Sequence, residues 1–211
     1  VLWRHLPVEG GVELTNCTHQ RGCFTVVGPL AREVLEPITE TDLSNKNFGW
    51  LNARVSTIGF CPDVRMLRLS YEGELGWELY HPIQHQMGLL KSIVESGAAH
   101  GLKLAGARAI ESTRLDKTYR AMYRDLNVEH TALEAGLDRF VKFDNRKFIG
   151  RDALLEQRKL GLTRRLVPIK VETVDADAYM TEAIYQDGKL VGRVTSGGYS
   201  YHLGHSISMA Y

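Results

Sequence analysis

The chain has 211 residues, 44% of them hydrophobic and 24% charged, which is enough for one large domain or two small ones with a buried core. Its 26 basic and 25 acidic side chains are spread along the sequence, so no basic face indicates a nucleic-acid partner. Three cysteines without Cys-x-x-Cys spacing and the lack of an apolar run of ~18 residues predict a cytoplasmic protein, or a mitochondrial matrix protein if eukaryotic, with no membrane partner.

The first part of the chain shows both strand and helix patterns. Alternation of apolar and polar residues predicts strands over 11–16, 23–27, 53–60 and 64–70. A helix is expected to begin near Pro29 and to end at Pro37, because the fixed φ of proline suits a first turn and interrupts a helix interior. After Pro82, a second helix is predicted to place one apolar face on the core, formed by Ile83, Met87, Leu90 and Val94.

The second part of the chain begins with a helix and ends in strands. A helix is predicted over 104–118, where Glu111 and Arg114 have the spacing of a solvated ion pair one turn apart. A short helix follows at 150–160, and strands are predicted over 166–171, 183–185, 190–195 and 206–211, with a hairpin turn at Asp187-Gly188. The change to strands alone predicts a domain boundary that separates residues 1–160 from residues 161–211.

The densest group of chemically capable side chains lies in the stretch 69–80. An alternating run leads into it, and Gly73 and Gly76 interrupt a strand pattern that resumes at Trp77, as in a hairpin with an acidic tip. The glycines permit positive φ or a close approach of the backbone to a flat ligand, and the stretch also holds three carboxylates and three aromatic rings. Spacing alone fits an ordinary hairpin with solvated glutamates equally well.

The residues Tyr71 to Tyr80, Tyr-x-Gly-Glu-Leu-Gly-Trp-Glu-Leu-Tyr, resemble the folate-binding region of the dimethylglycine and sarcosine dehydrogenases, which are related to the aminomethyltransferase (T-protein) of the glycine cleavage system. Further stretches agree with that family in the same order along the chain: 41–44, 105–117, 133–137, 148–154 and 192–201. The agreement extends over essentially the whole chain, which makes the resemblance much more specific than any one of the motifs.

The resemblance implies an α+β fold, in which an antiparallel sheet with packed helices precedes a small β-barrel or jelly roll. Residues 1–160 would then be an aminomethyltransferase-like folate-binding domain without its N-terminal part, and residues 161–211 a truncated barrel. The implied cofactor is tetrahydrofolate, which would receive the one-carbon unit of an N-methyl amino acid and become methylene-tetrahydrofolate. FAD is expected only in a flavin domain or subunit outside this chain. The family's catalytic aspartate is likewise expected outside it, so no catalytic residue is assigned here.

The resemblance also implies which residues would bind the cofactor. Glu78 corresponds to the pterin-binding glutamate, whose two oxygens match the amino group and ring N–H of a pterin. Tyr71 corresponds to a ring of the folate pocket, Gly73 would allow close backbone approach, and Arg114 corresponds to an arginine of the same site. Arg139 occupies a position where the family commonly has an aromatic ring, and an arginine plane can also stack on a heterocycle.

Other positions leave the functional interpretation open. Met122 replaces a family tryptophan, and Trp77 and Glu74 are interpreted as core and hairpin residues. His81 and His85 are four residues apart, but no third ligand is near them in the sequence, so no metal is predicted. Two alternatives therefore remain beside the dehydrogenase: a stand-alone folate-dependent aminomethyltransferase or demethylase relative, and a non-catalytic regulatory subunit of the same architecture.

Overall fold

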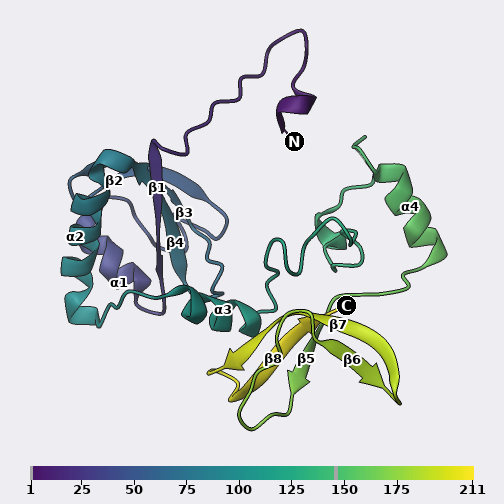
Figure 1. Cartoon of the computed structure of the whole chain (residues 1–211). Coiled ribbons are helices and arrows are strands. Elements are labelled where there is room, and N and C mark those ends of the chain that lie inside the picture. Colours follow the sequence, from purple (N-terminus) through teal and green to yellow (C-terminus); the bar gives the residue numbers. More distant parts are fainter. Residues whose placement is uncertain (1, 145–146) are drawn as a thin grey trace. The chain divides into compact units, whose positions relative to one another are not determined.

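The computed structural model describes residues 2–144 and 147–211 and shows two four-stranded antiparallel sheets accompanied by four α-helices (Figure 1). The chain divides into two compact units. The first comprises the residues up to Ser70 together with Glu74–Leu104, and the second comprises Tyr71–Gly73 together with Ala105–Tyr211. Val1 and residues 145–146 fall within the predicted 1–160 domain but lie outside the described residues. The predicted boundary near residue 160 stays a prediction.

The sheet of the first unit has the strand order β1-β4-β3-β2, and all of its neighbours are antiparallel. Its strands are β1 (Arg21–Val27), β2 (Ala53–Ile58), β3 (Cys61–Leu67) and β4 (Gly76–Pro82). Its helices are α1 (Ala31–Leu35) and α2 (Gln86–Gly97), with 3-10 turns η1 (Leu2–His5), η2 (Glu36–Ile38), η3 (Ile83–His85) and η4 (Ala98–His100). Residues 11–16, predicted as a strand, form no regular element, so pairing begins only at β1.

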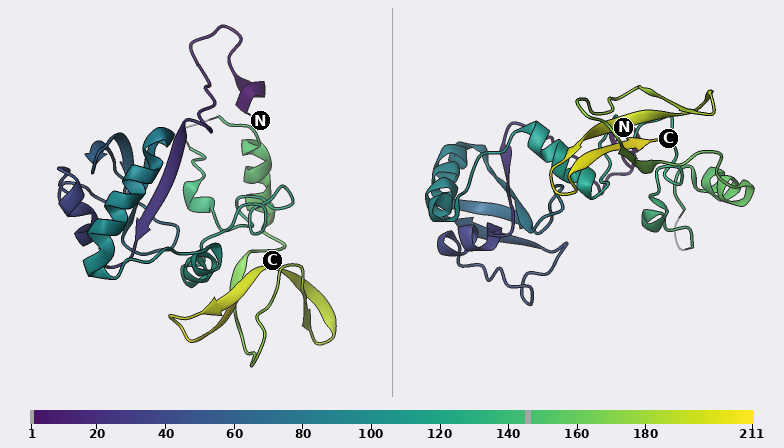
Figure 2. Two further views of the ribbon diagram at one scale, coloured as in Figure 1. Left: turned by 60° about the vertical axis from the view of Figure 1, so that its left-hand side comes forward. Right: turned by 90° about the horizontal axis from the view of Figure 1, so that it is seen from below.

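Alternation along β4 separates a buried face from a polar face of the first sheet. Trp77, Leu79 and His81 are fully buried, and the first two belong to a core cluster shared with α1 and α2. Both helices lie against this face of the sheet (Figure 2). Glu78 and Tyr80 alternate with the buried residues and therefore project from the opposite face. The prediction that Trp77 is a core residue is confirmed.

The buried face of α2 differs from the one that the sequence predicts. Leu89, Ile93 and Gly97, spaced four residues apart, face the core, whereas Met87 is 71% exposed. The helix ends at Gly97, where a Cβ would lie 2.5 Å from Leu102. Because Gly97 has no side chain, Leu102 in the segment after the helix can pack closely against α2.

The second unit contains two helices and the other sheet. Its helices are α3 (Ala107–Asp116) and α4 (Arg151–Leu160), with a 3-10 turn η5 (Asp138–Phe140). Its strands are β5 (Val167–Val171), β6 (Ala183–Gln186), β7 (Lys189–Ser200) and β8 (His205–Ala210), in the order β5-β8-β7-β6. Asp187 and Gly188 both have positive φ between β6 and β7, which confirms the predicted hairpin turn. The predicted α+β class is confirmed as well.

No helix in the described part of the chain combines the length and apolar character that crossing a membrane requires.

Candidate functional site

Glu78 lies near the start of β4, on the face of the first sheet that the helices do not cover. Thr25 of β1 and Leu67 of β3 flank it in the sheet register. Its side chain is partly buried, and its Oε2 accepts a hydrogen bond of 2.8 Å from the hydroxyl of Tyr80. The second carboxylate oxygen, Oε1, accepts no hydrogen bond from the described residues.

The carboxylate of Glu78 contributes to the raised pKa values of two neighbours on the same face. Its hydrogen bond from Tyr80, followed by partial burial, raises the pKa of that phenol to about 12. Burial and then the charge of Glu78 raise the pKa of the Cys23 thiol, which lies opposite Tyr80 on β1. At neutral pH this face therefore presents one carboxylate beside two neutral donors.

In the second unit, the segment Tyr71–Gly73 lies against the residues that follow α3. The Tyr71 hydroxyl donates to the carbonyl oxygen of Arg120 at 3.0 Å, and its ring stacks on Tyr119 with centroids 6.3 Å apart. Gly73 has φ +75°, and a Cβ there would lie 2.2 Å from Cγ of Lys117. Glycine is thus required at this position both by the backbone conformation and by the close approach of Lys117.

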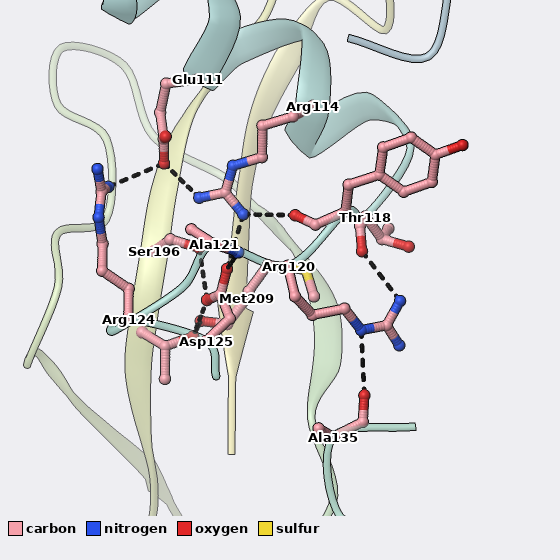
Figure 3. Close-up of polar contacts among 12 residues, drawn as sticks. Glu111, Arg114, Thr118, Arg120, Ala121, Arg124, Asp125, Ala135, Ser196 and Met209 are labelled. Carbon is pink, nitrogen blue, oxygen red and sulfur yellow. Dashed lines mark hydrogen bonds and ion pairs between the residues drawn. The ribbon is translucent and has the colours of Figure 1, made fainter. Parts of the chain in front are cut away.

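Arg114 lies in the last turn of α3 and is completely buried, so it does not form the solvated pair that its spacing with Glu111 predicts. The guanidinium donates to the Glu111 carboxylate, to Asp125 Oδ2 at 2.7 Å and to the carbonyl oxygen of Tyr119 at 2.7 Å (Figure 3). Glu111 also accepts a 2.9 Å bond from Arg124. Burial by itself lowers the pKa of Arg114, but the two carboxylates raise it above its ordinary value.

Asp125 is the centre of this buried network. Its carboxylate accepts hydrogen bonds from Arg114, from the backbone N–H of Ala121 at 2.8 Å, from Ser196 Oγ at 2.7 Å and from Thr195 Oγ1. The donors come from α3, from the loop after it and from β7, so one carboxylate connects three parts of the second unit. Neither the periodicity nor the resemblance singled out Asp125, because it lies in an irregular loop.

Several buried polar atoms around this segment have no hydrogen-bond partner among the described residues. They are Glu72 Oε2, Arg114 Nε and Asp116 Oδ1. Glu72, 8% exposed, immediately follows Tyr71. Buried polar groups are normally paired in folded proteins, so unpaired acceptors and donors indicate where a polar ligand or ordered water would bind. The sequence-based prediction assigned no role to Glu72 or Asp116.

Arg139 lies elsewhere in the second unit, within η5. Its guanidinium stacks over the ring of Phe140 at 4.6 Å and lines a cavity of about 1190 Å³. The structure therefore places Tyr71, Gly73 and Arg114 together around the end of α3, and Arg139 on the wall of this cavity. Glu78 belongs to the first unit and has its own surroundings there.

Comparison with known families gives two matches that follow each other along the chain. A model of the GCVT N-terminal domain matches residues 1–145, and a model of the glycine cleavage T-protein C-terminal barrel domain matches residues 164–211. Human mitochondrial dimethylglycine dehydrogenase is 41% identical over 207 residues, which cover 97% of this chain and 24% of that protein. An aminomethyltransferase of Caldanaerobacter subterraneus is 35% identical over 201 residues, covering 94% of this chain and 52% of the relative.

The fold comparison agrees with the sequence comparison. The crystal structure of glycine cleavage system aminomethyltransferase T from Bartonella henselae matches with a TM-score of 0.80 and 24% identity, over 90% of this chain and 51% of that one. The chain thus spans about a quarter of the dehydrogenase and about half of the aminomethyltransferases that it matches. Because the model of the N-terminal domain alone covers more than half of the residues, the chain belongs to the glycine cleavage T-protein family.

Proposed function

We propose that the chain is the tetrahydrofolate-binding portion of an FAD-dependent N-methyl amino acid dehydrogenase of the dimethylglycine and sarcosine type. In this proposal, tetrahydrofolate receives the one-carbon unit and leaves as methylene-tetrahydrofolate. The motif Tyr71 to Tyr80 and the similarity to dimethylglycine dehydrogenase along almost the entire chain support this assignment. FAD and the N-methyl substrate would bind to a separate flavin domain or subunit.

The observation that carries the proposal is the group of buried, unpartnered polar atoms in the Tyr71–Gly73 segment and at the end of α3. Glu72 Oε2 and Asp116 Oδ1 can accept hydrogen bonds, and Arg114 Nε can donate one. Tyr71 adds an aromatic ring beside them. This mixture of a ring, acceptors and a cation suits a flat heterocycle with several N–H groups, which is the chemistry of a pterin.

The resemblance also assigns a pterin contact to Glu78, and the surroundings of its carboxylate within the first unit suit that chemistry. One oxygen is occupied by Tyr80, and the other is available to an amino group or ring N–H of the pterin. Tyr80 is protonated at neutral pH, and its hydrogen bond to Glu78, which raises its pKa to about 12, orients the carboxylate as an acceptor. Gly73 and Arg139 are assigned to the cofactor by the resemblance alone, because Lys117 packs against Gly73 and Arg139 lies on the wall of the separate cavity. Catalysis itself is assigned to no residue of this chain.

The proposal is tested by titrating 5-formyl-tetrahydrofolate into the protein and into a Glu78→Gln variant. Loss of a charge-assisted hydrogen bond should weaken binding by about 1.5–3 kcal/mol, or roughly 10- to 150-fold. Glu95→Gln, an exposed change in α2, serves as the matched control and should leave the affinity unchanged. Equal affinities for the protein and Glu78→Gln would remove Glu78 from the site.

A stand-alone aminomethyltransferase is the second candidate, because the chain is 35% identical to such an enzyme over most of its own length. The two functions differ in whether the full-length protein contains a flavin. A yellow protein whose flavin is bleached by dimethylglycine or sarcosine would favour the dehydrogenase. A colourless protein that transfers an aminomethyl carbon to tetrahydrofolate would favour the aminomethyltransferase, and a colourless protein without transfer activity would favour the regulatory alternative.

A further inference from the structure

The cavity that Arg139 lines is unusually rich in positive charge. It lies within the second unit, measures about 1190 Å³ and is lined by residues between Leu133 and Arg165. Its wall contains five cationic side chains: Arg139, Lys142, Arg158, Arg164 and Arg165. Asp138 and Asp144 are its two carboxylates, so the wall carries an excess of positive charge, whereas the chain as a whole is almost neutral.

Most of these cations are not neutralised by the protein. Arg164 pairs with Glu134 Oε1 at 3.0 Å and also donates to the carbonyl oxygen of Glu129 at 2.6 Å. Within residues 2–144 and 147–211, no carboxylate forms an ion pair with Arg139, Lys142, Arg158 or Arg165. Like charges gathered in one concavity repel one another, and concave walls strengthen their combined potential. The arrangement therefore favours the entry of an anion.

Two of the arginines also lie over aromatic rings. The guanidinium of Arg158 lies 5.6 Å from the ring centroid of Phe143, and that of Arg139 lies 4.6 Å from the centroid of Phe140. Stacking on a ring restricts the plane of a guanidinium but leaves its edge N–H groups available. An arginine edge matches the paired oxygens of a carboxylate or a phosphate.

We propose that this cavity is a binding site for a small polyanion, a molecule with at least two carboxylate or phosphate groups. A single phosphate would occupy little of about 1190 Å³, a volume slightly above the usual range of small-molecule sites. Several separate cations on the wall suit several separate anionic groups. Leu133, Val141 and Phe143 supply apolar surface for the carbon skeleton between those groups. The proposal stands independently of the pterin contacts assigned to Glu78.

The test measures the binding of pyrophosphate and of citrate by titration calorimetry at low ionic strength. The two probes separate phosphate from carboxylate chemistry, and binding of either one supports the proposal. An Arg158→Gln, Arg165→Gln double variant should bind the preferred probe at least about 10-fold more weakly. Both side chains are exposed, so the variant should unfold at the same temperature as the parent, and Arg165→Gln alone should give a smaller loss.

Arg193→Gln is the matched control, because Arg193 is half exposed, pairs with Glu129 and does not line the cavity. It should leave the affinity unchanged, and so should Glu78→Gln. A failure of the folate proposal and a failure of this one are therefore distinguishable. Absence of millimolar or tighter binding for both probes would overturn the proposal, as would equal affinities of the parent and the double variant.

Discussion

At the scale of single residues, the carboxylate of Asp125 has the most partners. It is completely buried, yet it accepts bonds from a guanidinium, two hydroxyls and a backbone N–H. A buried ion pair of this kind adds little net stability over an apolar pair, but removing one partner leaves an uncompensated charge. Arg114 would be left with incomplete compensation, because it is fully buried and would keep only Glu111, a carboxylate that it shares with Arg124.

We therefore predict that Asp125→Asn lowers the free energy of unfolding by about 3–5 kcal/mol, measured by urea denaturation. The amide keeps the size of the side chain, so the loss reports charge and hydrogen bonding rather than a cavity. Asp187→Asn, the same change in an exposed hairpin turn, should stay within about 0.5 kcal/mol. A loss below about 1 kcal/mol for Asp125→Asn would contradict the role assigned to this carboxylate.

Gly73 tests the close contact between the Tyr71–Gly73 segment and Lys117. Gly73→Ala adds a methyl group at positive φ and against the Lys117 side chain, so it should cost about 2–3 kcal/mol of unfolding free energy. Gly204 has almost the same φ, +72°, with nothing within 4 Å of a Cβ, and Gly204→Ala should cost only about 1 kcal/mol. Adding Lys117→Ala to Gly73→Ala should reduce its cost toward that of Gly204→Ala; no recovery would refute the contact.

At the scale of elements, α2 shows why a helix was easier to predict than the side it buries. The helix has more apolar residues than one face can hold. Two sets of them have helical spacing, and either set could face the core. The predicted set, which contains Met87 and Val94, begins with Ile83, and that residue lies in η3 before the start of α2. The structure buries Leu89 and Ile93 instead, and the small residue Gly97 continues that face. Which set faces the sheet depends on packing, and the pattern alone contains no packing information.

The other glycine of α2, Gly88, offers a stabilising prediction. It lies on the exposed side of the helix, and a Cβ there would have nothing within 4 Å. Gly88→Ala should therefore raise the free energy of unfolding by about 0.5–1 kcal/mol, because alanine loses less conformational entropy in a helix interior. Thermal and urea denaturation measure the change. Destabilisation would mean that the solvent-exposed face of α2 is in contact with another group.

Three strands of the second sheet, β5, β6 and β8, lie within one residue of their predicted limits. Asp187-Gly188 marks the end of β6 and the start of β7, and alternation marks β5 and β8, but β7 continues to Ser200, five residues beyond its predicted end. Residues 11–16 alternate equally well but form no strand. An alternating sequence becomes a strand only when a partner strand satisfies its backbone groups, and β4 pairs with β1 from Arg21 onward.

At the scale of the whole molecule, the sequence identified the family and the α+β class, whereas the local surroundings of the candidate residues required coordinates. The helical spacing of Glu111 and Arg114 predicted an ion pair correctly but placed it in solvent. Arg114 pairs with Asp125, whose carboxylate also accepts hydrogen bonds from Thr195 and Ser196 on β7, which are far away in sequence. The roles of Tyr71, Gly73, Glu78, Arg114 and Arg139 in folate binding stay predictions until binding is measured.

Long-range contacts also determine how the stability of the molecule depends on pH. His130 stacks on the ring of Tyr211 near the C-terminal end of the second unit, with centroids 3.5 Å apart. Burial, followed by the positive charge of Arg164, lowers the pKa of His130 from 6.5. The same burial raises the pKa of the Tyr211 phenol to about 12, so that ring remains neutral over the accessible range.

The sign of the pH effect follows from the lowered pKa of His130. Well above pH 6.5 the imidazole is neutral in both the folded and the unfolded state and contributes no pH dependence. As the pH falls through 6.5 toward the lower folded-state pKa, the unfolded chain binds the proton more readily, and stability is lost. His130→Phe keeps a ring against Tyr211 and cannot titrate, so its unfolding free energy should fall less between about pH 7.5 and pH 5. His100→Phe, an exposed change in η4, should retain the parent's slope, and an identical slope for all three proteins would show that His130 does not contribute.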